Sequence, residues 1–124
     1  MDGAETVNHQ NKILFLSLAA AALATGCQSP DVYYWDHYEN LIYASYAKPG
    51  KSPPESQILV MQADEQKAIA ANKPLPPGFH AHLGYLYYET GKSDLAVQEF
   101  QKEKAKFPES TVFMDRLIAN LKKK

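Results

Sequence analysis

The sequence predicts an all-α fold: a short array of about five helices that follows an N-terminal signal segment. Two observations support this. After residue 32, apolar residues recur three and four positions apart, the spacing of one helix face, and no segment alternates as a strand does. Turn-forming Pro and Gly residues then divide the chain into five such segments, with breaks near residues 48–51, 73–78, 91–93 and 107–108.

Each predicted helix has an apolar face that we expect to be buried. The faces are Tyr38, Leu41, Ile42 and Tyr46 in residues 36–47; Ile58, Leu59 and Ala63 in residues 52–72; Phe79, Leu83, Leu86 and Tyr87 in residues 79–90; Ala96, Phe100 and Phe107 in and just after residues 94–106; and Met114, Leu117, Ile118 and Leu121 in residues 110–122. These faces together form the core of one small domain.

Three helix ends are predicted from local signals. Ser52 is the expected N-cap of the second helix, with Pro53 at its first position and Glu55 closing a capping box. Ser93 is the expected N-cap of the fourth helix. Gly91 is expected in the left-handed conformation that ends the third helix.

The third and fourth helices resemble a tetratricopeptide repeat, in which 34 residues form two antiparallel helices. Seven positions match at the spacing of the repeat: Leu83, Gly84, Tyr87, Gly91, Ala96, Phe100 and Pro108. Two positions depart from it, since His80 replaces a tryptophan and Glu103 an alanine. One repeat cannot bury its own apolar faces, so the resemblance implies a tetratricopeptide-like array completed by the other three helices.

The first 27 residues resemble a bacterial lipoprotein signal. An apolar run, residues 13–25, is too short to span a bilayer and leads into Gly26 and Cys27, the only cysteine. The resemblance implies a signal peptide over residues 1–26, a lipidated tether over residues 27–32 and a helical domain over residues 33–124. A buried helix is the alternative, but this run has no polar face.

The lipoprotein resemblance makes Cys27 the lipidation site and first mature residue, carrying diacylglycerol and N-acyl (palmitate-type) chains. More than one chain gives stable anchoring to membrane lipid. Gln28, where an aspartate would retain the protein at the inner membrane, favours the outer membrane. The expected location is the bacterial cell envelope, on the periplasmic side of the outer membrane.

Charge and composition limit the partners of the mature part. Residues 27–124 contain twelve basic and twelve acidic side chains, without the clustered basic face that nucleic acid binding requires. We therefore expect no nucleic acid partner. The oligomeric state does not follow from the sequence.

Three further stretches resemble a family of small Gram-negative lipoproteins catalogued as domain of unknown function 4810. These are residues 77–88, Phe100 with residues 103–105, and residues 107–117. A Tyr-Tyr-Trp stretch before a short helix and Lys-Pro-Gly fits the same family. The resemblance implies an envelope protein partner, such as a lipoprotein like the curli secretion channel, and no established activity.

Tyr33, Tyr34 and Trp35 follow the tether within a few residues. Five extended residues reach at most about 18 Å, so these rings are expected close to the lipid headgroups, where Tyr and Trp are favoured. The alternative is that they pack the first helix onto the core. Both can hold for different rings.

No motif predicts catalysis, and we expect no enzyme, no cofactor and no metal site. His80 and His82 stand two positions apart, so on a helix they point about 200° apart and do not converge on one ion; His37 does not change this. No nucleophile elbow, phosphate-binding glycine loop or paired carboxylates in an apolar cleft is recognisable.

The sequence thus favours a lipid-anchored helical adaptor that docks a partner in the groove of its paired helices. Tyr85, Tyr88 and Lys92 are the candidate partner-binding residues. A periplasmic carrier of a small ligand or metal, and a purely structural envelope lipoprotein, are the alternatives.

Overall fold

A computed structural model describes residues 31–123, and this part of the chain contains only helices and the turns between them. The helices are α2 (Tyr38–Ala47), α3 (Pro54–Ala70), α4 (Phe79–Glu89), α5 (Ser93–Lys106) and α6 (Thr111–Leu121), with a 3₁₀ turn, η1 (Pro108–Ser110), before α6. The predicted all-α fold of five helices is confirmed. The predictions for the signal segment and Cys27 lie outside the described residues.

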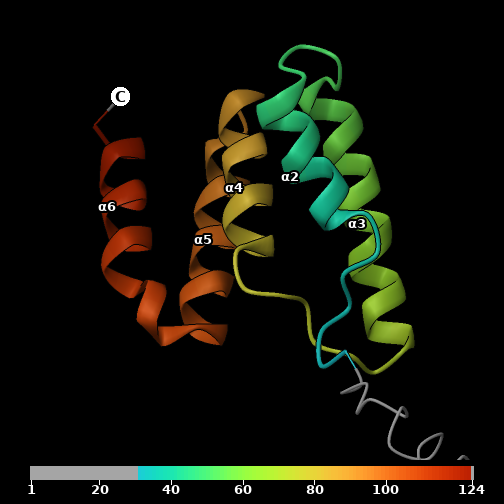
Figure 1. Cartoon of the computed structure of the whole chain (residues 1–124). Coiled ribbons are helices and arrows are strands. Elements are labelled where there is room, and N and C mark those ends of the chain that lie inside the picture. The colour runs from blue at the N-terminus through green and yellow to red at the C-terminus, as the bar shows by residue number, and fades with distance from the viewer. Residues whose placement is uncertain (1–30, 124) are drawn as a thin grey trace, which may run out of the picture. The chain divides into compact units, whose positions relative to one another are not determined.

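The helices pack around α4 and α5, which form the central pair (Figure 1). Helix α6 packs on α5, and α3 packs on α4. The Tyr38 ring packs α2 against α4, and its centroid lies 5.5 Å from the centroid of the Phe79 ring. None of the helices in residues 31–123 is long and apolar enough to cross a membrane.

The α4–α5 pair is close because Gly84 has no side chain. A Cβ atom at Gly84 would lie 2.7 Å from Cε1 of Phe100 and 3.1 Å from the carbonyl oxygen of Ala96. These distances are shorter than van der Waals contact, so the two helices pack at a separation that only glycine permits at this position. The buried faces predicted for these helices are confirmed except at Phe107, which is half-buried: Phe79, Leu83, Leu86, Tyr87, Ala96 and Phe100 are all buried.

Gly91 ends α4 in the predicted left-handed conformation, with φ of +75°. The Lys92 N–H donates to the Tyr87 carbonyl at 2.8 Å, and the Gly91 N–H donates to the Tyr88 carbonyl at 3.0 Å. This pair of bonds is the Schellman motif, which satisfies the last carbonyls of the helix. The chain therefore reverses tightly from α4 into α5.

The N-terminus of α4 is capped from another helix. Glu103, near the end of α5, accepts hydrogen bonds from the Gly78 N–H at 2.7 Å and the Ala81 N–H at 3.3 Å. A carboxylate is favoured there, because the first amides of a helix lack internal acceptors and carry the positive end of its dipole. The departure of Glu103 from the repeat's alanine thus has a structural role.

Two predicted caps are wrong. Helix α3 begins at Pro54 with Pro53 as its N-cap, and no side chain caps it. Ser52 instead accepts a hydrogen bond at its carbonyl from the Gln57 side chain, at 2.9 Å. Helix α5 includes Ser93 as its first residue, so Lys92 occupies the N-cap position.

Three residues predicted to be buried are exposed: Tyr46, Leu59 and Ala63. In α3 the buried face is Gln57, Ile58, Met61, Asp64 and Ala68, so it includes two polar side chains. Both are buried because they bond to neighbouring elements, which an apolar pattern does not reveal. In α2 Tyr38 is buried, while Leu41 and Ile42 are half-buried.

Glu103→Gln is expected to lower the free energy of unfolding by about 1–3 kcal/mol, because a part-buried amide at the start of α4 would lose its acceptor and the cap would lose its charge. Urea unfolding measures this change. Glu109→Gln, an exposed residue of η1, is the control. An effect at Glu103 no larger than the control would contradict the cap.

Candidate functional site

Exposed aromatic side chains gather on α2 and α4. Tyr43 and Tyr46 of α2 are 68% and 85% exposed, and Tyr85 of α4 is 49% exposed. Trp35 and Ile42, both half-buried, line a shallow depression of about 510 Å³ together with Tyr43 and Tyr46. We call Trp35, Ile42, Tyr43, Tyr46 and Tyr85 the aromatic face.

Tyr85 is included in this face because it is an exposed ring of α4, and the Tyr38 ring of α2 packs against α4 at Phe79 and His82. A hydrogen bond to the Glu89 carboxylate is the main cause that raises the pKa of Tyr85. Tyr43 and Tyr46 on α2 and Tyr85 on α4 are all exposed. The aromatic face therefore continues from one helix to the next.

The three candidate partner-binding residues do not share one environment. Tyr85 is at the surface, whereas Tyr88 is half-buried and packs against the core. The Lys92 ammonium lies 5.9 Å from the centre of the Tyr87 ring, a cation–π arrangement. Of the three, Tyr85 is the one that lies on the aromatic face.

Tyr33, Tyr34 and Trp35 are half-buried and contact the domain. The Tyr33 ring lies 6.1 Å from Trp35 and 6.3 Å from Phe107, and Trp35 stacks on Tyr38 at 6.3 Å. These contacts support the interpretation that the rings pack the first helix onto the core. Their contact with lipid headgroups stays a prediction.

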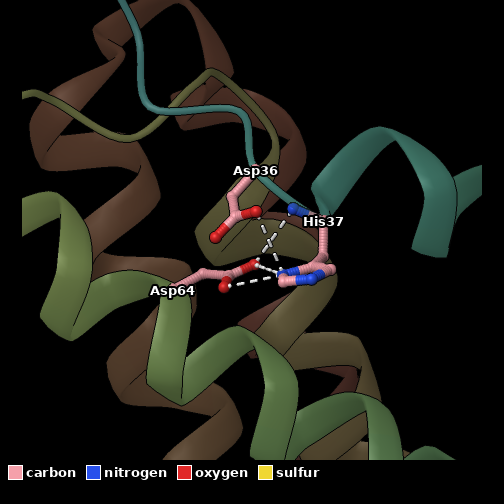
Figure 2. A group of neighbouring side chains, drawn as sticks. All are labelled: Asp36, His37 and Asp64. Carbon is pink, nitrogen blue, oxygen red and sulfur yellow. Dashed lines mark hydrogen bonds and ion pairs between the residues drawn. The ribbon is translucent and has the colours of Figure 1, made fainter.

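Asp36, His37 and Asp64 converge at the start of α2 (Figure 2). Asp64 is buried on α3 and accepts a hydrogen bond from the His37 N–H at 3.2 Å. The His37 ring nitrogen Nδ1 lies 3.0 Å from Oδ1 of Asp64 and 3.3 Å from Oδ1 of Asp36. One ligand-type atom from each residue lies within 4.8 Å of the others, a spacing that a metal ion can use.

Lys67 already supplies a positive charge to this cluster. Its ammonium lies 2.9 Å from Oδ2 of Asp36 and 3.4 Å from Oδ1 of Asp64. The hydrogen bond from Lys67 is the main cause that lowers the pKa of Asp36. The arrangement favours a structural role, in which these four side chains hold the start of α2 on α3, and we call them the clasp. One of the four, Asp36, has an unusual φ of +30°.

The sequence did not reveal this clasp, because its two aspartates lie on different elements far apart in the chain. One signal was available. Asp64 continues the spacing of Ile58, Met61 and Ala68, so an acidic residue stands on the buried face of a helix. A buried carboxylate requires partners, and basic residues are the expected ones.

The histidines of α4 do not converge, as their spacing predicted. His80 is buried and bonds through Nδ1 to Glu99 of α5 at 2.8 Å, and Glu99 also accepts from the Lys102 ammonium at 2.7 Å. His82 faces α3 instead, where its Nε2 lies 3.3 Å from Oε1 of Gln57. Each histidine therefore links α4 to a different neighbour.

The fold and this surface define a small five-helix domain with an exposed aromatic face. The chain belongs to the family described as a domain of unknown function, DUF4810, whose family model matches residues 32–117. The match begins at the segment before α2 and ends within α6. No curated protein and no solved structure matches the chain.

Stability is expected to fall in mild acid because of His82. Burial lowers the pKa of His82 below its ordinary value of 6.5. The unfolded chain then binds the proton more strongly, so the stability that neutral His82 confers is present above about pH 6.5 and is lost as the pH falls through the folded-state pKa. His82→Gln should flatten this part of the curve in urea unfolding at a series of pH values.

Glu99 gives an internal control at lower pH. Burial alone would raise its pKa, but hydrogen bonds from His80 and Lys102 outweigh burial and lower it below 4.5. Its contribution is therefore lost only as the pH falls below that value. A pH dependence between about pH 7 and pH 5 that His82→Gln leaves unchanged would contradict the assignment to His82.

Proposed function

We propose that the protein is a lipid-anchored adaptor of the bacterial cell envelope that docks a partner protein through the aromatic face. Acylated Cys27 holds it to membrane lipid, on the periplasmic side of the outer membrane. The short apolar run that leads into Gly26 and Cys27 supports the anchor. The exposed rings of α2 and α4 support the docking surface.

The exposure of Tyr46 and Tyr43 is the observation that carries the proposal. Large rings that stay in water contribute little to the stability of the domain itself, whereas Tyr and Trp supply much of the binding energy in protein interfaces. Here the rings lie over a shallow apolar depression rather than singly. Such a surface fits a helix or extended segment laid across α2 and α4.

The repeat resemblance points to the same surface. In the proposed tetratricopeptide-like array, α2 and α4 are the first helices of successive hairpins, and a groove between paired helices is the expected docking mode. The family resemblance implies a partner within an envelope assembly, such as a lipoprotein like the curli secretion channel. The small-ligand carrier and the purely structural lipoprotein are the competing outcomes of the test.

Crosslinking in a host that naturally produces the protein, followed by purification from detergent-solubilised envelopes, tests the proposal. We expect the wild-type chain to bring down a defined envelope protein. The double variant Tyr46→Ser with Tyr85→Ser should reduce that capture at least about tenfold, as the loss of two interface rings does elsewhere.

Leu59→Ser is the matched control, because Leu59 is 67% exposed on α3 and lies outside the aromatic face. It should leave capture unchanged. Circular dichroism and urea unfolding establish that all variants keep the fold. Capture that is equal for the double variant and the control would contradict docking through the aromatic face.

A further inference from the structure

A second concave surface lies between α3 and α5 and shares no lining residue with the depression of the aromatic face. It is a groove of about 690 Å³ bordered by the C-terminal ends of both helices, the α3–α4 loop and the first described residues of the chain. Its apolar lining includes Val32, Ile69, Leu75 and Phe107. Val32 and Ile69 are 68% and 66% exposed, so an apolar surface here is open to an occupant.

Two lysines on this groove have no side-chain partner within residues 31–123. Lys73 and Lys106 both line it, and neither forms an ion pair or side-chain hydrogen bond in the described part of the chain. Lys102 also lines the groove, but its ammonium is bonded to Glu99 at 2.7 Å and near Glu65 at 3.5 Å. Glu65 also lines the groove, and its carboxylate pairs with Lys102, so within residues 31–123 the unpaired charge of the groove is positive.

An apolar groove with two ammonium groups that lack a partner in the described residues matches an anionic amphiphile. A phosphate ester accepts hydrogen bonds from lysine, and an attached hydrocarbon chain covers exposed apolar side chains. Neither an inorganic anion nor a neutral lipid uses both features. An acidic peptide with apolar residues would use both features as well, so the location of the groove in the chain has to distinguish a lipid from a peptide.

Position favours a lipid. Val32 borders the groove and stands five residues after Cys27, so the chain between them reaches at most about 18 Å. If Cys27 is acylated, as the proposed function holds, the groove is confined to the neighbourhood of the membrane surface. Anionic lipid headgroups are then the most concentrated ligands of the required chemistry near Lys73 and Lys106.

We propose that this groove binds one anionic phospholipid of the membrane that anchors the protein. Lys73 and Lys106 bind the phosphate, and the side chains of Ile69, Leu75 and Phe107 cover the start of an acyl chain. The site would fix the orientation of the domain on the membrane and leave the aromatic face available to a partner. This inference rests on the proposed anchoring through Cys27.

Photocrosslinking in vesicles tests the inference. The full-length gene is expressed in a Gram-negative host, and the protein extracted from its membranes is reconstituted in phosphatidylcholine vesicles. These contain a small fraction of either photoactivatable phosphatidylglycerol or photoactivatable phosphatidylcholine. We expect crosslinks, mapped by mass spectrometry, at the peptides that contain Ile69 and Phe107, with phosphatidylglycerol favoured about tenfold or more, since each lysine near an anionic surface contributes about 1 kcal/mol.

Charge reversal gives the matched variants. Lys73→Glu with Lys106→Glu should reduce phosphatidylglycerol labelling of the groove to the level of phosphatidylcholine. Lys48→Glu with Lys51→Glu, an equal change of charge in the exposed turn between α2 and α3, should leave it unchanged. Equal labelling by the two lipids, or equal effects of the two double variants, would overturn the inference.

Two further measurements distinguish a phospholipid from a free phosphate, and the lipid site from the anchor at Cys27. Inorganic phosphate that abolishes the labelling would overturn the inference, because the groove would then be a site for a free anion. The mass of the N-terminal peptide in the same spectra reports whether Cys27 is acylated. An unmodified Cys27 with selective labelling of the groove would contradict the lipid anchor alone. An acylated Cys27 without labelling would contradict the lipid-binding groove alone.

Discussion

Gly84 lies where α4 and α5 are in close contact, and the packing of the domain depends on the missing side chain there. Phe100 occupies the space that a Cβ atom would need, and both residues are buried in the central pair. Because α3 packs on α4 and α6 packs on α5, the separation of this pair also sets where the outer helices lie. The aromatic face combines α2 with α4, and the lysine-bordered groove lies between α3 and α5, so each surface uses one helix of the central pair.

Polar side chains then fix the ends of the pair and the neighbours around it. Glu103 caps α4 from α5, His80 bonds to Glu99, and Asp64 holds the start of α2 through His37. In the described residues every buried side-chain nitrogen and oxygen has a hydrogen-bond partner. An unsatisfied buried polar group is costly, so these bonds specify one arrangement of the helices rather than adding much net stability.

The sequence predicted the central pair well because its signals are local. Gly91, Ala96 and Phe100 stand at fixed distances along the chain, and the structure places them as expected. It failed where a residue's role depends on a distant partner. Tyr46 fitted a helical stripe but lies in water, buried Asp64 was not recognised, and the lysines of the groove come together only after folding. Of the candidate partner-binding residues on α4, Tyr85 is exposed, whereas Tyr88 is half-buried and packs against the core.

The most direct measurement of the central claim is the coupling between Gly84 and Phe100. Gly84→Ala should lower the free energy of unfolding by about 1–3 kcal/mol through overpacking, although alanine favours a helix by about 1 kcal/mol over glycine. In the double variant with Phe100→Leu, the cost of Gly84→Ala should shrink, because the ring edge that it meets is gone. Urea unfolding of the four proteins provides the comparison. A stabilising Gly84→Ala, or strictly additive effects, would contradict the account.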